Sequence, residues 1–166
     1  MTDIKKPGMR TRYHGDLHLG QVLHSGPDFV IIDFEGEPMR SLADRRIKRS
    51  PIRDVAGLLR SFDYARHVAI RDAIERGLAE EAGDAREILE TWGQCWYSWV
   101  AASFIRSYLA TSAGASHLPP LPEDTAALLE IYMLEKAIYE LGYEMSSRPD
   151  WAGVPLQGVL DILGPR

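Results

Sequence analysis

The chain has 166 residues, 45% of them hydrophobic and 26% charged, which suits one domain with a core of ordinary size and excludes a disordered chain. Its net charge of −5 argues against a broad nucleic-acid-binding surface, which needs clustered lysine and arginine. Cys95 is the single cysteine, so no disulfide forms within the chain, and we interpret it as a small buried residue of a reducing, cytoplasmic protein.

The first twelve residues are polar, and we predict a mobile tail at 1–12 followed by one domain at 13–166. The opening of the chain is charged, with no apolar run behind it, so we expect no signal peptide. The most apolar stretch, Trp96 to Ala110, is interrupted by Arg106 and is too short to cross a bilayer. We therefore expect a buried helix there, and no membrane partner.

A β-hairpin is predicted near the N-terminus. Two short apolar runs, residues 21–23 and 29–32, flank the segment Ser25-Gly26-Pro27-Asp28, whose composition is typical of a turn. Residues 39–50 are polar and rich in arginine, and we interpret them as a connecting segment.

Beyond residue 50 the pattern is helical. Ser50-Pro51 is a helix start signal, and apolar residues follow at helical spacing. Further helices are expected at about 84–112 and 123–145 and after residue 150, with a proline-rich loop at 114–122. The tryptophans and tyrosines of the second helix predict burial on several of its faces. The fold class is therefore mainly α with one small β-hairpin.

Three oxygen-bearing side chains surround the hairpin: Asp16, Gln21 and Asp33. Phosphoryl transfer needs an oriented acceptor hydroxyl and Mg²⁺ held against phosphate oxygens. A carboxylate on a tight loop can accept the hydroxyl proton, and Mg²⁺ prefers hard oxygen ligands such as amides and carboxylates. Asp16 and Gln21 have the offset of the kinase pattern H-x-D-x-x-x-x-N, and Asp33-Phe34 follows where D-F-G would lie. This joint spacing predicts a magnesium-dependent phosphotransfer site.

Other interpretations of the same residues stay open. Asp16 could be a turn residue and Asp33 the cap of a strand end, and His14 is more often structural than an acid or base. His14, Asp16 and His18 also spell H-x-D-x-H, a pattern of metal-dependent hydrolases. Such sites need further ligands on other loops, and the remaining histidines lie outside acidic motifs.

Several strings together resemble one family, the maltokinases: HGDLHLGQVL at 14–23, DFEGEP at 33–38, SPIRDVAGLLRSFDYA at 50–65 and LEKAIYELGYE at 134–144. These are ATP-dependent kinases with an aminoglycoside-phosphotransferase-like fold, often fused behind a trehalose synthase. The resemblance covers nearly the whole chain from residue 12. It implies the C-terminal catalytic lobe of a protein-kinase-like fold, with ATP and Mg²⁺ as cofactors.

The resemblance also implies roles for matching positions. Asp16 would be the catalytic base, and Gln21 and Asp33 would bind Mg²⁺, with Gln21 replacing the usual Asn of the wider superfamily. Asp54 would accept backbone N–H bonds from the catalytic loop, and His14 would support that loop. The acceptor would be maltose, converted to maltose 1-phosphate, or a related sugar. The candidate substrate contacts are His18, Glu35, Glu135, Tyr139 and Arg148.

Helical spacing supports part of the sugar site. Glu135, Tyr139 and Tyr143 recur every four residues and so share one face of a helix. Carboxylates with aromatic platforms suit a disaccharide. Against this, the tyrosines could belong to the core, and Lys136 and Glu140 have the spacing of an ordinary surface ion pair.

No strand pattern or glycine-rich loop precedes Tyr13, so we expect the N-terminal nucleotide lobe of such a kinase to be absent from these residues. The chain alone should then bind nucleotide weakly and turn over poorly. The expected partners are a sugar, a nucleotide, the missing lobe or a trehalose synthase, and a second copy through the hairpin side. The alternatives are a non-catalytic carbohydrate-binding or interaction module, and an aminoglycoside- or choline-type kinase with a more acidic pocket.

Overall fold

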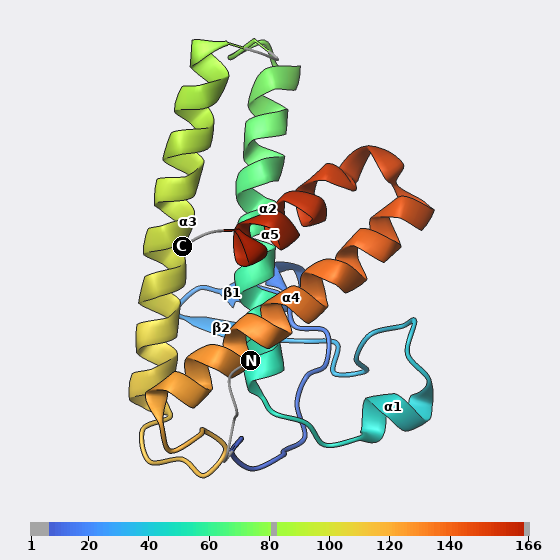
Figure 1. The fold of residues 1–166 in the computed structure, drawn as a ribbon, viewed down its shortest axis with the longest axis vertical. Helices are drawn as coiled ribbons and strands as arrows, with labels where there is room; N and C mark the ends of the chain where they lie inside the picture. The colour runs from blue at the N-terminus through green and yellow to red at the C-terminus, as the bar shows by residue number, and fades with distance from the viewer. Residues whose placement is uncertain (1–6, 81–82, 165–166) are drawn as a thin grey trace.

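The computed structural model describes residues 7–80 and 83–164 (Figure 1). The strands are β1 (Val22–Ser25) and β2 (Asp28–Ile31), and 3-10 turns lie at η1 (Leu19–Gln21) and η2 (Pro149–Trp151). The helices are α1 (Leu42–Arg46), α2 (Ile52–Glu75), α3 (Asp84–Thr111), α4 (Pro122–Ser147) and α5 (Gly153–Leu163). The predicted class, mainly α with one hairpin, is confirmed over these residues.

The helical body is arranged around α2. Helix α3 runs beside α2, α4 crosses α2, and α5 folds back onto α4 (Figure 1). The centre of the small hydrophobic core is formed by Val55 and Leu59 of α2 and Ala101 of α3. Because α2 packs against both α3 and α4, a side chain at its N-terminal end has a fixed position relative to α4.

The β-hairpin has the predicted register and turn. Val22 pairs with Ile31 and Ser25 pairs with Asp28, so Gly26 and Pro27 form the two-residue connection. Gly26 has a φ of 69°, a left-handed conformation that glycine adopts without steric cost. All four residues of β2 are exposed.

Helix α2 starts at the predicted place, but Pro51 and not Ser50 is the residue that directly precedes its first helical residue. The hydroxyl of Ser50 accepts the N–H of Ile52 at 3.4 Å, and its carbonyl accepts the N–H of Arg53 at 3.2 Å. The segment 39–50, interpreted as a connection, contains the short helix α1. Ser41 caps it by accepting the Asp44 N–H at 3.2 Å.

Two burial predictions are wrong. The helix at 84–112 is present, but Ala101 is the one buried residue of α3, and Trp92 and Trp99 are 70% and 75% exposed. Cys95, expected to be buried, is exposed as well. The reason is that α3 packs chiefly against α2 on one side, and no described element covers its opposite face.

The predicted tail differs from the structure over its second half. Residues 1–6 lie outside the described residues. Beyond them, the Met9 N–H donates to the Ser116 carbonyl at 2.9 Å, and Thr11 forms an antiparallel bridge with Arg49. Residues 7–12 therefore lie against the segments that precede α2 and α4, because their backbone groups find partners at Arg49 and Ser116. Over residues 7–80 and 83–164, none of the helices has both the length and the hydropathy to cross a bilayer.

Candidate functional site

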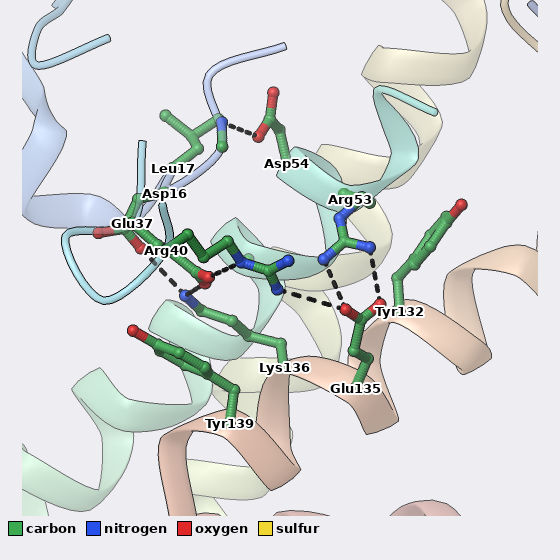
Figure 2. A pocket seen from close by; sticks show the side chains of 12 residues that line it. Asp16, Leu17, Glu37, Arg40, Arg53, Asp54, Tyr132, Glu135, Lys136 and Tyr139 are labelled. Carbon is green, nitrogen blue, oxygen red and sulfur yellow. Dashed lines mark hydrogen bonds and ion pairs between the residues drawn. The ribbon is translucent and has the colours of Figure 1, made fainter. Parts of the chain in front are cut away.

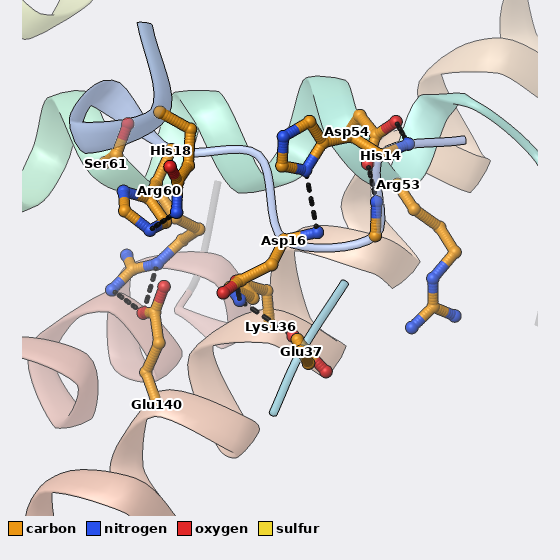
Figure 3. A network of polar contacts seen from close by, with 12 residues as sticks. His14, Asp16, His18, Glu37, Arg53, Asp54, Arg60, Ser61, Lys136 and Glu140 are labelled. Atoms are coloured by element: carbon orange, nitrogen blue, oxygen red, sulfur yellow. Dashed lines mark hydrogen bonds and ion pairs between the residues drawn. The ribbon is translucent and has the colours of Figure 1, made fainter. Parts of the chain in front are cut away.

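One face of α2 holds the loop that carries Asp16. The Asp54 carboxylate accepts the backbone N–H groups of His14 at 2.7 Å and Gly15 at 2.9 Å (Figure 3). Burial raises the pKa of Asp54 more than these two hydrogen bonds lower it. The carboxylate thus holds the first two residues of the H-G-D segment in place.

Two further residues on the same face of α2 continue this support. A Cβ atom at Gly57 would lie 2.6 Å from the carbonyl oxygen of Leu17, so the loop can touch the helix there only because residue 57 is glycine. The hydroxyl of Ser61 accepts the N–H of Leu19 at 3.1 Å. Residues 54, 57 and 61 are three and four positions apart and so form one row, which we call the α2 track.

His14 joins this loop to the end of the hairpin. The Asp16 N–H donates to Nδ1 of His14 at 3.3 Å, and Nε2 lies 2.7 Å from the carbonyl oxygen of Ile32. An amide can only donate and a carbonyl can only accept, so the ring is neutral, with its proton on Nε2. The buried ring also contacts Phe34, with 4.9 Å between ring centroids. The His14 ring therefore links the backbone of Asp16 to the backbone of Ile32, the residue before Asp33.

Gln21 and Asp33 meet at the base of the hairpin. Nε2 of Gln21 donates to Oδ2 of Asp33 at 2.8 Å, and the Ile32 N–H donates to the Gln21 carbonyl at 3.0 Å. Asp33 has a φ of 61°, and it is the one non-glycine residue with positive φ in the described chain. Such a conformation costs free energy and is concentrated at functional sites.

The donor set at Gln21 and Asp33 fits Mg²⁺. One amide and one carboxylate supply the hard oxygens that Mg²⁺ prefers, leaving its other positions to water and phosphate. Among the described residues, no group of three or more His, Cys, Asp or Glu side chains could hold a metal ion. Gln21 and Asp33 would supply two oxygen ligands to a bound Mg²⁺ ion.

Lys136 of α4 reaches into the loop and contacts Asp16. Its Nζ lies 3.0 Å from Oδ1 of Asp16 and 2.8 Å from Oε1 of Glu37 (Figures 2 and 3). Burial alone would lower the pKa of Lys136, but the two carboxylates raise it above its ordinary value. Burial raises the pKa of Glu37, yet Lys136 and Arg40 outweigh it, and the net shift is downward. Asp16 therefore has a permanent cation beside it.

Glu135 is held by arginines. Arg53 makes two hydrogen bonds to its carboxylate, at 2.8 and 2.7 Å, and Arg40 lies 3.4 Å from Oε1 (Figure 2). The Arg53 guanidinium also lies 5.1 Å from the ring centroid of Tyr132. A sugar hydroxyl would have to share this carboxylate with two cations.

Two adjoining hollows open beside Asp16. Three of the expected substrate contacts, His18, Tyr139 and Arg148, line one of them together with Asp16. Glu135 lines the other, again with Asp16 and Tyr139. Glu35 is exposed and is not among the residues that line either hollow. His18 and the predicted helix face thus converge on Asp16, whereas Gln21 and Asp33, like Glu35, are not among the residues that line either hollow.

Lys136 and Glu140 do not form the surface pair that their spacing allows. Lys136 bonds to Asp16 and Glu37, and Glu140 accepts from the Nε and a terminal nitrogen of Arg60 at 3.0 and 2.9 Å. Burial raises the pKa of Glu140 more than Arg60 lowers it. Sequence reasoning gave no place in the site to Glu37, Arg53, Gly57 or Ser61. For these residues the one available signal was Gly57, because a glycine in the middle of a strongly helical pattern suggests a close contact.

Comparisons with known proteins identify sugar kinases. The chain is 33% identical over 147 residues to a glucosamine kinase of Mycolicibacterium smegmatis and 27% identical over 154 residues to one of Streptacidiphilus jiangxiensis. These alignments cover 86% and 92% of the chain but 32% of each relative. The chain thus spans about a third of the length of the curated relatives it matches. No family model matches it.

Solved structures show the same fold. A glucosamine kinase in complex with glucosamine, ADP and inorganic phosphate matches with a TM-score of 0.70, covering 90% of this chain and 34% of that structure. Another crystal form of a glucosamine kinase matches with a TM-score of 0.71. Sequence identity is 23% in both, so the likeness establishes the fold. The predicted similarity to sugar kinases is supported, but a specific similarity to maltokinases is not shown.

Proposed function

We propose that this chain is the catalytic part of a sugar kinase and transfers the γ-phosphate of ATP to a sugar hydroxyl. Asp16 would accept the hydroxyl proton, and Gln21 and Asp33 would hold Mg²⁺ against the phosphates. The observation that carries the proposal is the connection through His14, whose ring bonds Asp16 on one side and the residue preceding Asp33 on the other. Magnesium, when bound, would neutralise charge on the transferred phosphoryl group.

The charge pattern of the two hollows favours a neutral acceptor. Each lining carboxylate already has a partner among the described residues. Asp16 and Glu37 pair with Lys136, Glu135 with Arg53, Glu140 with Arg60 and Glu144 with Arg148, while Asp54 accepts two backbone N–H groups. The ammonium group of an amino sugar would find no free carboxylate among these lining residues. A neutral sugar such as maltose, which the sequence resemblance implies, therefore suits this site better than glucosamine.

The nucleotide-binding part of such a kinase would come from elsewhere. The chain spans a third of its relatives, and the exposed strand β2 leads directly into Asp33. We propose that the missing lobe covers this hairpin and that the chain alone is a slow enzyme. A fused trehalose synthase stays a prediction from the resemblance.

The test is single-turnover transfer of labelled phosphate from ATP, with the chain in excess over the nucleotide. We expect slow, magnesium-dependent labelling of maltose or glucose and less labelling of glucosamine. Asp16→Asn should lower the rate by about 100-fold or more, because the proton acceptor is lost. Equal rates for Asp16→Asn and the wild type would contradict the proposal. Sugar binding that depends on neither metal nor nucleotide would favour a non-catalytic module.

A further inference from the structure

A row of large apolar side chains lies on the outer face of α3. Ile88, Trp92 and Trp99 are 57%, 70% and 75% exposed, and Cys95 between them is exposed too. They recur every three or four residues and so share one side of the helix. Together with Asp84 before them and Arg106 after them we call this row the outer stripe.

The outer stripe faces away from the hydrophobic core. The residues of α3 that pack toward α2 include Tyr97, Ala101 and Phe104. At about 3.6 residues per turn, Ile88 and Arg106 are five turns apart and point the same way, opposite to Ala101. In Figure 1, α3 forms one edge of the molecule, with α2 on its inner side. No described element packs against the stripe, and one edge of it, at Cys95 and Trp99, borders a hollow that residues of α2 and α5 also line.

Its composition is that of an interface core. From Thr91 to Ile105 the sequence of α3 contains no charged residue. A helix face that stays in water normally carries charges, whereas interface cores are depleted of charge and enriched in tryptophan. The nearest charges along the stripe are Asp84 at one end and Arg106 at the other. The face is therefore uncharged in its middle and has opposite charges at its two ends.

We propose that the outer stripe binds a second copy of this chain, with the two α3 helices antiparallel. Cys95 lies eleven residues from Asp84 and eleven from Arg106. A two-fold axis at Cys95 would therefore place Asp84 of each copy opposite Arg106 of the other. The two charge pairs formed in this way would lie about 33 Å from each other along the helices. A parallel pair would place like charges together. The stripe is therefore complementary to a second copy of itself, whereas a different polypeptide would need its own charges at the same spacing.

The dimer is independent of the proposed sugar kinase function. The residues of the candidate site lie on the loop at 14–21, the segment at 33–40, α2 and α4, and none of them is on α3. The surface also differs from the hairpin side, where the sequence predicted self-association. Phe29 on β2 is 66% exposed and offers a matched large apolar residue on that other surface.

Sedimentation velocity over a wide concentration range tests the proposal. We expect the wild-type chain to dimerise, and Trp99→Lys to raise the dissociation constant by about 100-fold or more, because it places a charge in the apolar centre of both copies. Phe29→Lys should leave the dissociation constant unchanged. A wild-type monomer at all concentrations, or dissociation by Phe29→Lys and not by Trp99→Lys, would overturn the proposal. Far-ultraviolet circular dichroism of each variant checks that the helices are retained.

A charge exchange tests the antiparallel arrangement. Asp84→Arg and Arg106→Asp should each weaken the dimer, and the double variant should recover it, since each new arginine again faces a new aspartate. Mild oxidation should link the copies through Cys95, and Cys95→Ser should remove this cross-link. Absence of recovery in the double variant together with absence of the cross-link would rule out this arrangement.

Discussion

Lys136 and Glu37 determine the charge around Asp16. Glu37 is 5% exposed, and its carboxylate bonds both Lys136 and Arg40. The carboxylates of Asp16 and Glu37 would each be costly to bury alone, and the ammonium group of Lys136 offsets that cost for both. This arrangement fixes the Asp16 side chain before any ligand binds.

The lowered pKa of Glu37 gives a pH-dependent expectation. Unfolded, this carboxyl group takes up its proton near 4.5; folded, it does so at lower pH. Its contribution to the free energy of unfolding is therefore complete above 4.5 and is lost as the pH falls through the folded value. Glu37→Gln should lower the free energy of unfolding near neutral pH by about 2 kcal/mol, and the difference should shrink in acid.

Urea denaturation at several pH values measures this difference. Glu35→Gln is the matched control, because Glu35 is exposed and only two positions away. It should change the free energy of unfolding little at any pH. A Glu37→Gln difference that stays constant into acid would show that the ion pairs with Lys136 and Arg40 are not its source.

At the scale of elements, the α2 track is what holds the loop in position. Gly57 permits contact between the helix and Leu17, and Asp54 and Ser61 bind backbone groups on either side of it. Helix α2 therefore acts both as the centre of the core and as the support of the candidate catalytic loop.

Two glycine substitutions separate this contact from helix propensity. Gly142→Ala in α4 meets nothing within 4 Å and should stabilise the protein by about 0.5–1 kcal/mol. Gly57→Ala has the same gain in propensity but would collide with Leu17, and we expect a net destabilisation of about 1–3 kcal/mol. Thermal unfolding gives the sign of each change. Stabilisation by Gly57→Ala would mean that the loop does not rest on α2.

For the whole molecule, a buried ionic cluster connects α2 to α4. Arg60 is 2% exposed and bonds Asp63 at 2.8 Å and Glu140 at 2.9 Å. Gly158 of α5 packs so closely on the Arg60 guanidinium that a Cβ atom there would collide with it. Three helices thus meet at one cation.

Removing that cation should be costly. Arg60→Met leaves Asp63 and Glu140 without their shared partner, and we expect a loss of about 3–5 kcal/mol in the free energy of unfolding. Arg76→Met, which breaks an exposed pair with Asp72, should cost less than about 1 kcal/mol. Chemical denaturation compares the two variants. Similar losses for both would show that the buried cluster adds nothing beyond a surface pair.

Local signals in the sequence predicted much of this molecule. The turn composition at 25–28 and the Ser50-Pro51 start signal act over a few residues, and both elements are present. The pairing of Lys136 with Asp16 depends on how α4 crosses α2, which helical spacing does not encode. The exposure of Trp99 depends on which elements surround α3, so aromatic content alone led to the wrong burial prediction. Glu37 was missed because no local pattern distinguishes it from the exposed Glu35.

The central claim is that Gln21 and Asp33 form a metal site beside Asp16. Paramagnetic Mn²⁺ with ADP, added to the isotope-labelled chain, tests this directly by nuclear magnetic resonance. We expect the side-chain amide of Gln21 and the backbone amides of residues 16 and 33 to broaden first, and Asp33→Asn to remove the effect. Broadening spread evenly over the surface carboxylates, or unchanged in Asp33→Asn, would contradict the claim.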